Sequence, residues 1–259
     1  MGIITEYRLE EKYNHNILSV IFDSDSFFYG ISDVNNQLKL ASKFRLEGNA
    51  VDEISSIIQN ENLSDHYYSA VNIYSKLPNF SFIPANEYQY GMERDIISNA
   101  FPLENEEIGM EICSEDNLHI IHSYSQLYIK AFEPLTKDAQ FRHLSLAYIQ
   151  NIREDGVFVN VLDGELIIMV RKNTNFTFYN QFNTPTNDDQ LYFVMLTYHQ
   201  LSLDPLKDHL YLHGDKIQVE EFKVMVSDYV ANVEDSTLGF LNVEGGSDII
   251  DLYLASICE

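Results

Sequence analysis

The chain has 259 residues, of which 45% are hydrophobic and 22% are charged, and this composition excludes a wholly disordered protein. Its 40 Asp and Glu residues against 16 Lys and Arg residues give a formal net charge of −24 at pH 7. Because nucleic acids and anionic membrane surfaces are bound through Lys and Arg, this charge argues against both kinds of partner.

The first third of the chain predicts three strands, a helix and a fourth strand. We expect the three strands at 17–22, 27–31 and 38–46, where β-branched and aromatic residues are separated by short polar turns. A helix begins near Gly48, because the apolar residues that follow recur at helical spacing: Val51, Ile54, Ile57 and Ile58. A strand over 67–74 closes this unit.

The middle of the chain is less regular. The acidic stretch from Glu104 to Glu107 reads as a loop, and Pro134 is expected to interrupt a helix. We expect strands at 80–84 and 118–122. We expect helices at 87–100, 125–139 and 144–153.

The last hundred residues repeat the pattern of the first third. Strands at 157–162 and 166–170 flank Asp163-Gly164, and an Asp-Gly pair between two apolar runs strongly indicates a β-hairpin. A Thr186 cap then marks the start of a helix. After the hairpin we expect strands at 176–182 and 210–212. We expect helices at 186–201, 219–230 and 248–258.

The two copies share more than their order of elements. The first tight turn is acidic in both, with Asp23-Ser24-Asp25-Ser26 in one copy and Asp163-Gly164-Glu165 in the other. The duplication predicts an α/β protein with two related lobes that face each other across a cleft. We place the lobes at residues 1–155, which include the irregular middle segment, and 156–259.

Two copies of a three-stranded meander followed by helix, strand and helix resemble the actin-like ATPase fold. This resemblance implies two duplicated ribonuclease-H-like lobes, each a mixed sheet with flanking helices. Four segments are similar to an uncharacterised bacterial family, a domain of unknown function related in fold to pilus-assembly and type II secretion platform proteins: 178–182, 188–192, 203–205 and 212–214. The resemblance covers most of the chain, but it implies little about chemistry because the family has no settled activity.

Active members of this fold hold the phosphates on two hairpin turns, one per lobe, and the adenosine on a glycine-rich strand-to-helix turn. Such turns need glycine, since backbone N–H groups must converge on the phosphate oxygens with no side chain in the way. Here the first turn has no glycine, and Asp25 would repel a phosphate about 4 Å away by about 4 kcal/mol at an effective dielectric of 20. The resemblance places the nucleotide-site positions at Asp23, Ser24 and Ser26, at Asp163 and Gly164, and at Gly214 and Lys216.

We therefore expect a pseudo-ATPase, a non-catalytic scaffold or protein-interaction protein without catalytic residues, cofactor or bound metal. The alternative is an enzyme, an ATP-binding phosphotransferase or ATPase of the actin-like and sugar-kinase superfamily that uses Mg-ATP. In it, Asp23 and Asp163 would orient Mg²⁺-bound water. A two-metal nuclease is disfavoured because the chain is acidic and shows no basic groove.

Histidines and cysteines offer little further chemistry. His119 and His122 fall on opposite faces of a strand, and His209 and His213 would lie roughly 13 Å apart, so we expect both pairs to be structural. The two cysteines show no metal-type or redox-type spacing.

Signals for export are also missing from the sequence. The first residues show no signal peptide, and no apolar run reaches the roughly 18 residues of a membrane span. We expect a cytoplasmic protein with no direct membrane insertion. Its partners are expected to be proteins, among which a basic one would suit the acidic surface.

Overall fold

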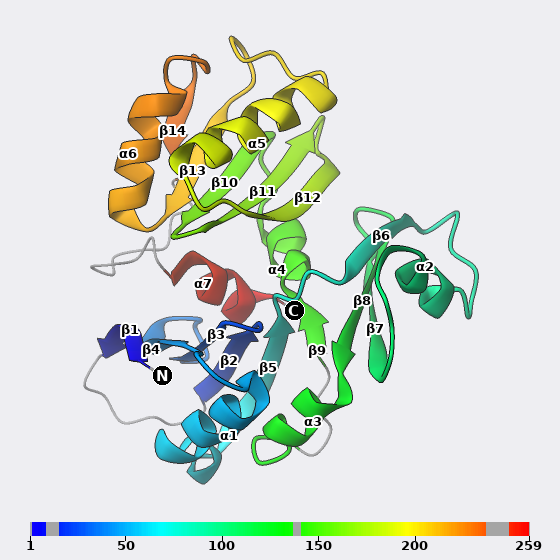
Figure 1. The fold of residues 1–259 in the computed structure, drawn as a ribbon, viewed down its shortest axis with the longest axis vertical. Coiled ribbons are helices and arrows are strands. Elements are labelled where there is room, and N and C mark those ends of the chain that lie inside the picture. Colours follow the sequence, from blue (N-terminus) through cyan, green and yellow to red (C-terminus); the bar gives the residue numbers. More distant parts are fainter. Residues whose placement is uncertain (1, 9–15, 137–140, 237–248, 259) are drawn as a thin grey trace. The chain divides into compact units, whose positions relative to one another are not determined.

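The computed structural model describes residues 2–8, 16–136, 141–236 and 249–258 (Figure 1). The chain forms two compact units, the first made of Met1–Asn151 with Asp251–Glu259 and the second of Ile152–Ile250. The C-terminal residues therefore pack with the first unit, whereas the sequence led us to assign 156–259 as one lobe.

The first unit is built on a mixed six-stranded sheet. Its central strand β2 is antiparallel to β3 and parallel to β5. Strands β2, β3 and β4 therefore form a meander, and β5 returns beside β2. In spatial order the strands are β1 (Gly2–Arg8), β4 (Leu38–Arg45), β3 (Ser26–Ser32), β2 (Asn16–Phe22), β5 (Tyr68–Ser75) and β9 (Phe141–His143).

Helices cover both faces of this sheet. Helix α1 (Ala50–Asn60), which Asn49 caps, and helix α3 (Gln126–Phe132) bury Ile54 and Phe132 in one core with the inward residues of β2, β3 and β4. On the other face Gly30 leaves room for Leu252 of helix α7 (Ile250–Ile257), because a Cβ on Gly30 would overlap that side chain. A short 3-10 turn (Leu63–Asp65) joins α1 to β5.

A smaller sheet is inserted between β5 and β9. It contains β6 (Phe80–Pro84), β8 (Leu118–Ser125) in the middle and β7 (Glu106–Cys113), all antiparallel. Helix α2 (Glu93–Ala100) packs on one face of this sheet through Ile97, which lies in a small core with Ile83 and Ile121.

Helix α4 (Leu144–Asn151) joins the first unit to the second in the chain, and its residues 144–149 are all buried. It pairs with α7 through polar contacts inside the first unit. The Tyr148 hydroxyl donates to the Asp251 carboxylate, and Gln150 Oε1 lies 2.8 Å from Cys258 Sγ. These contacts tie the C-terminal helix to the first unit.

The second unit repeats the architecture of the first. The meander of β10, β11 and β12 is followed by helix α5 (Asn187–Gln200), and β13 then returns parallel to β10. Helix α6 (Lys216–Val226) leads to the last strand. In spatial order the strands are β12 (Asn175–Asn183), β11 (Glu165–Lys172), β10 (Gly156–Leu162), β13 (Leu210–Gly214) and β14 (Val233–Asp235).

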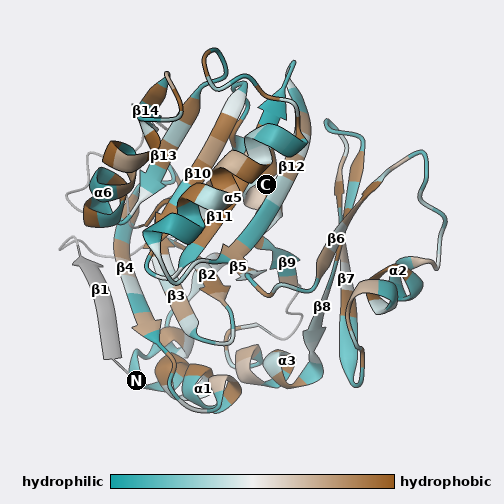
Figure 2. Ribbon diagram, turned by 45° about the horizontal axis from the view of Figure 1, so that its top comes forward, coloured by the Kyte–Doolittle hydropathy of each residue, from teal (hydrophilic) through white to brown (hydrophobic). Residues whose placement is uncertain are grey.

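The apolar runs of β10 and β11, brown in Figure 2, form the middle of the second core. Equivalent strands stand in the same order in both sheets, so the predicted duplication of an α/β unit is confirmed.

Several elements differ from the sequence-based expectation. The predicted acidic loop at 104–107 is half strand, because Glu106 and Glu107 begin β7. Strands β1, β9 and β14 were not expected, and they are held by pairing with strands far away in sequence. Helix α2 begins at Glu93 rather than at 87, and α3 ends at Phe132. The predicted positions 137–139 and 248 lie outside the described residues. No helix in the described ranges is long and apolar enough to cross a membrane.

Candidate functional site

The first candidate turn, Asp23 to Ser26, connects β2 to β3 and is held together by its own carboxylate. Asp23 Oδ1 accepts hydrogen bonds from the backbone N–H groups of Asp25 at 2.7 Å and Ser26 at 2.5 Å. Its Oδ2 accepts a third from Ser26 Oγ at 2.8 Å. An Asp side chain that bonds the backbone two and three residues ahead is a common way to close a turn. The N–H groups of Asp25 and Ser26 are thus already bonded within the turn.

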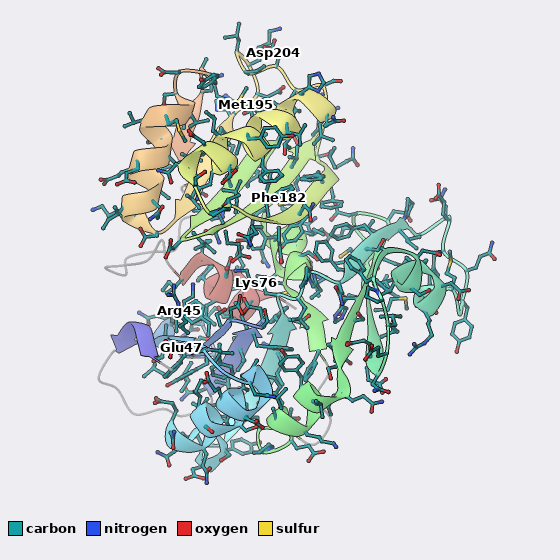
Figure 3. The ribbon with its side chains drawn as sticks, viewed as in Figure 1. Arg45, Glu47, Lys76, Phe182, Met195 and Asp204 are labelled. Carbon is teal, nitrogen blue, oxygen red and sulfur yellow. The ribbon has the colours of Figure 1, made fainter. Side chains whose placement is uncertain are left out.

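Two cations lie beside this turn, and the sequence alone did not place them there. Arg45 is the cross-strand partner of Ser26 in the β3–β4 register. Lys76 directly follows β5, and its backbone N–H donates to Phe22 O at 2.8 Å, next to Asp23. Both are labelled in Figure 3. Lys76 is only 6% exposed, which is uncommon for lysine. Finding either residue requires the register and the parallel pairing of β2 and β5.

The second candidate turn, Asp163-Gly164, joins β10 to β11 as a two-residue hairpin closed by the Leu162–Glu165 pair. Gly164 has φ 73°, a backbone conformation that favours glycine, and a Cβ there would meet nothing within 4 Å. The glycine is therefore explained by the turn itself. Asp163 is exposed beside it.

The third candidate turn follows β13 and begins α6. Gly214 has φ 123°, and a Cβ at this position would overlap the carbonyl oxygen of Val161 on the neighbouring strand. Asp215 Oδ1 accepts hydrogen bonds from the N–H groups of Ile217 and Gln218, both at 3.0 Å, and caps the helix. Lys216, the first residue of the helix, is exposed.

The second unit brings its own candidate residues to one edge of its sheet. β10 and β13 are parallel, and Val161 pairs with Gly214, so Asp163-Gly164 and Gly214 follow neighbouring strand ends. In α/β proteins ligands bind at this edge, where parallel strands end. In the first unit, Asp23, Ser24 and Ser26 lie in one turn. The predicted positions therefore fall on the expected turns, but in two of the three turns an Asp side chain bonds the backbone N–H groups.

A buried polar cluster in the first unit has the residue types of a hydrolytic triad. His122 Nδ1 lies 3.4 Å from Ser75 Oγ, and its Nε2 lies 2.8 Å from Glu111 Oε1. Ser75 and His122 are completely buried, so the hydroxyl cannot meet a substrate. The arrangement joins β5 to the small sheet, and a structural role for His122 stays our prediction.

A second buried histidine lies next to this cluster. The rings of His122 and His143 are 5.8 Å apart, and His143 Nδ1 lies 2.7 Å from Ser145 Oγ. Burial, and second the nearby His122, lower the pKa of His143 to about 3. His143 is therefore neutral at physiological pH. Among the residues that the structure describes, no group of three or more His, Cys, Asp or Glu side chains is arranged to hold a metal ion.

Solved structures with a similar fold support the expected architecture. A protein of unknown function with an actin-like ATPase fold from Bacteroides thetaiotaomicron superimposes with a TM-score of 0.81 at 17% identity, covering 95% of this chain and 96% of that one. The PilM subunit match in the PilM–PilN type IV pilus biogenesis complex has a TM-score of 0.57 at 11% identity, with 93% and 96% coverage. The ethanolamine utilization protein EutJ from Carboxydothermus hydrogenoformans superimposes with a TM-score of 0.54 at 6% identity, covering 97% of this chain and 93% of that one.

At these identities the likeness shows the fold alone. None of the curated proteins matches this chain. A family model described as "Protein of unknown function (DUF3822)" matches residues 8–233. The predicted resemblance to an uncharacterised family with an actin-like fold, related to PilM, is confirmed, and the chain belongs to the DUF3822 family.

Proposed function

We propose that this protein is an actin-like pseudo-ATPase that acts through contacts with other proteins and does not turn over nucleotide. One observation carries the proposal: the Asp23 carboxylate accepts hydrogen bonds from the backbone N–H groups of Asp25 and Ser26 in the first hairpin turn. A nucleotide phosphate would have to displace a carboxylate that is covalently part of the same turn and is always present at high effective concentration.

Charge adds to this obstacle. Asp25 is exposed in the same turn, and a phosphate about 4 Å from it would be repelled by about 4 kcal/mol at an effective dielectric of 20. At the third turn Asp215 caps the first N–H groups of α6 in the same manner. In two of the three turns an Asp carboxylate of the chain itself thus accepts hydrogen bonds from backbone N–H groups.

A protein partner fits the remaining observations. The PilM neighbour, with a TM-score of 0.57, was solved in a complex with another protein, PilN. The net charge of −24 favours a basic partner and disfavours nucleic acid. We place the protein in the cytoplasm, where the buried Cys113 and Cys258 would stay reduced, outside any disulfide.

Titration with Mg-ATP tests the proposal directly. A ligand at a hundred times its Kd stabilises the folded protein by about 2.7 kcal/mol, which raises the Tm of a chain of this size by roughly 5–10 °C. We expect no saturable shift in Tm and no heat of binding by calorimetry. A saturable shift with Mg-ATP that Mg²⁺ and phosphate alone do not produce would contradict the proposal.

The second candidate is an ATP-dependent phosphotransferase or ATPase, and the cations beside the first turn favour it. Arg45 and Lys76 could offset the charge of Asp25, and Asp23 and Asp163 would orient Mg²⁺-bound water. This candidate predicts ATP turnover by the wild type that Asp163→Asn abolishes with the Tm unchanged. Absence of turnover with a broad panel of acceptors rules it out.

A further inference from the structure

Strand β7 has an edge that no other described strand covers. β8 lies between β6 and β7, so β7 pairs on one side only. Its pairing with β8 is regular over eight residues, from Glu106–Ser125 to Cys113–Leu118, with no bulge. A long, regular edge presents a row of backbone N–H and C=O groups that can pair with another strand.

Three devices that protect such an edge are missing from β7, although its glutamates do add charge. Natural edge strands are blocked by proline, by lysine or by a bulge, and the segment Glu106–Cys113 contains none of the three. The strand also presents apolar side chains to solvent. Met110 is 38% exposed and Ile112 is 58% exposed.

These two side chains extend an existing apolar surface. Residues 108, 110 and 112 alternate onto the face that α2 covers, and Ile108 packs against the small core there. The cross-strand partners are Ile121 for Met110 and His119 for Ile112. His119 is itself stacked on Tyr88, with ring centroids 4.3 Å apart. Met110 and Ile112 therefore prolong a packed face up to the open edge.

Charge decides which occupant suits this edge. Between residues 101 and 129 the chain has no Lys or Arg but six acidic residues: Glu104, Glu106, Glu107, Glu111, Glu115 and Asp116. Burial, and second the charge of Glu104, raise the pKa of Glu106, so a cation brought to this end would relieve repulsion. One cation already contacts this end of the strand, since the Arg94 guanidinium donates a hydrogen bond to the Glu106 carbonyl oxygen at 3.0 Å.

A second copy of this chain is disfavoured, because two β7 edges would place like charges opposite each other. A strand that carries Lys or Arg would instead place opposite charges beside the glutamates of β7. The alternation of β7 also sets the pattern of the occupant, since Met110 and Ile112 lie on one face while Glu107 and Glu111 lie on the other.

We propose that the open edge of β7 binds an extended segment of a basic partner protein, which adds to the small sheet as a fourth strand. Apolar residues of this segment pack beside Met110 and Ile112. Its Lys or Arg residues, in alternate positions, lie on the face of Glu107, whereas Glu111 on the same face is already bonded to His122. Backbone pairing supplies the affinity, and the alternation of apolar and basic residues supplies the specificity.

The probe for this surface is an acetylated and amidated eight-residue peptide that alternates Lys and Val. Binding to the full chain is measured by fluorescence anisotropy, and protection of the β7 amides is measured by hydrogen exchange. One control peptide alternates Glu and Val. A second keeps all the lysines but replaces two valines by proline, which preserves the charge and removes backbone donors.

Two double variants of the protein complete the design. Met110→Lys with Ile112→Lys changes the edge itself. Val34→Lys with Tyr67→Lys alters the protein's charge by the same amount and also removes two exposed hydrophobic side chains, 64% and 87% exposed, that lie outside the small sheet of β6, β7 and β8. We expect saturable binding of the Lys–Val peptide that weakens at least about tenfold in the β7 variant and stays near the wild-type value in the control variant.

Three results would overturn the proposal. They are no saturable binding, equal loss of affinity in both double variants, and equal binding of the proline peptide, since each would leave only general attraction to an acidic protein. If the β7 variant fails to fold, hydrogen exchange of the wild type decides alone. The peptide must then slow exchange in β7 and leave the edge strand β12 unchanged.

This proposal rests on the proposed function only in that both require a protein partner. The Mg-ATP titration and the peptide titration have separate readouts. Nucleotide binding would refute the pseudo-ATPase without touching the β7 edge, and failure of the peptide would refute the edge without restoring an ATP site.

Discussion

Replacing Asp23 by Ala tests whether the first turn is closed by its own carboxylate. The substitution removes the acceptor of three hydrogen bonds, at 2.7, 2.5 and 2.8 Å, from a half-buried side chain. Water can replace part of each bond, so each contributes about 0.5–1 kcal/mol, as measured for helix caps and similar turns. We expect a loss of about 2 kcal/mol in the free energy of unfolding, or roughly 4–8 °C in Tm.

Urea denaturation without nucleotide measures this loss, and Asp25→Ala is the matched control. Asp25 has the same charge and lies in the same turn, but it is exposed, so its removal should change the unfolding free energy by less than about 0.5 kcal/mol.

The opposite result would refute the reasoning. Carboxylates gathered to hold a metal repel one another in the empty protein, so removing one of them often stabilises it. If Asp23→Ala raised the Tm while Asp25→Ala did not, Asp23 would be a ligand-binding group and not the closure of the turn.

Three further predictions concern stability. Gly214→Ala should cost at least about 3 kcal/mol in urea denaturation, because its Cβ would overlap the Val161 carbonyl oxygen, whereas Gly164→Ala, with open space around it, should cost only about 1 kcal/mol. Gly109→Ala should destabilise by about 2 kcal/mol and change the His122 ring resonances in NMR spectra, since its Cβ would overlap His122 Nε2; unchanged resonances would argue against this contact. His143, neutral in the fold with a pKa of about 3, is protonated in the unfolded chain below pH 6.5, so stability present above pH 6.5 should fall by up to about 1.4 kcal/mol per pH unit towards pH 3. His143→Gln should flatten the unfolding free energy between pH 6.5 and 5, and an unchanged slope would contradict the assignment.

Most strands and helices of the fold could be predicted from the pattern of apolar residues in the sequence. The runs at 17–22 and 157–162, each followed by an acidic turn, were sufficient to predict two related meanders, and strands β2 and β10 match them within one residue. Strand β7 was missed because Glu106, Glu107 and Gly109 have low strand propensity, and pairing with β8 overrides it. The three-residue strands β9 and β14 are too short for any periodic signal.

The candidate site was predictable in position but not in its bonding. Asp23, Gly164 and Gly214 were located from turn patterns and the family resemblance, and all three lie on the expected turns. An Asp that bonds the backbone two and three residues ahead, as Asp23 bonds Asp25 and Ser26, is common in turns, but the sequence alone does not distinguish it from an Asp that orients a metal-bound water. Arg45 reaches the turn only through the β3–β4 register.

The carboxylates of Asp23 and Asp215 also bear on how such a protein keeps its fold without a ligand. In a nucleotide-binding relative, the N–H groups of these turns gain their partners when phosphate binds, so stability rises with nucleotide concentration. Here the partners belong to the chain and are present at all times. Stability should therefore be independent of nucleotide. A protein whose turns need no bound ligand to order them can keep the same surface, such as the β7 edge, available to a partner at any nucleotide concentration.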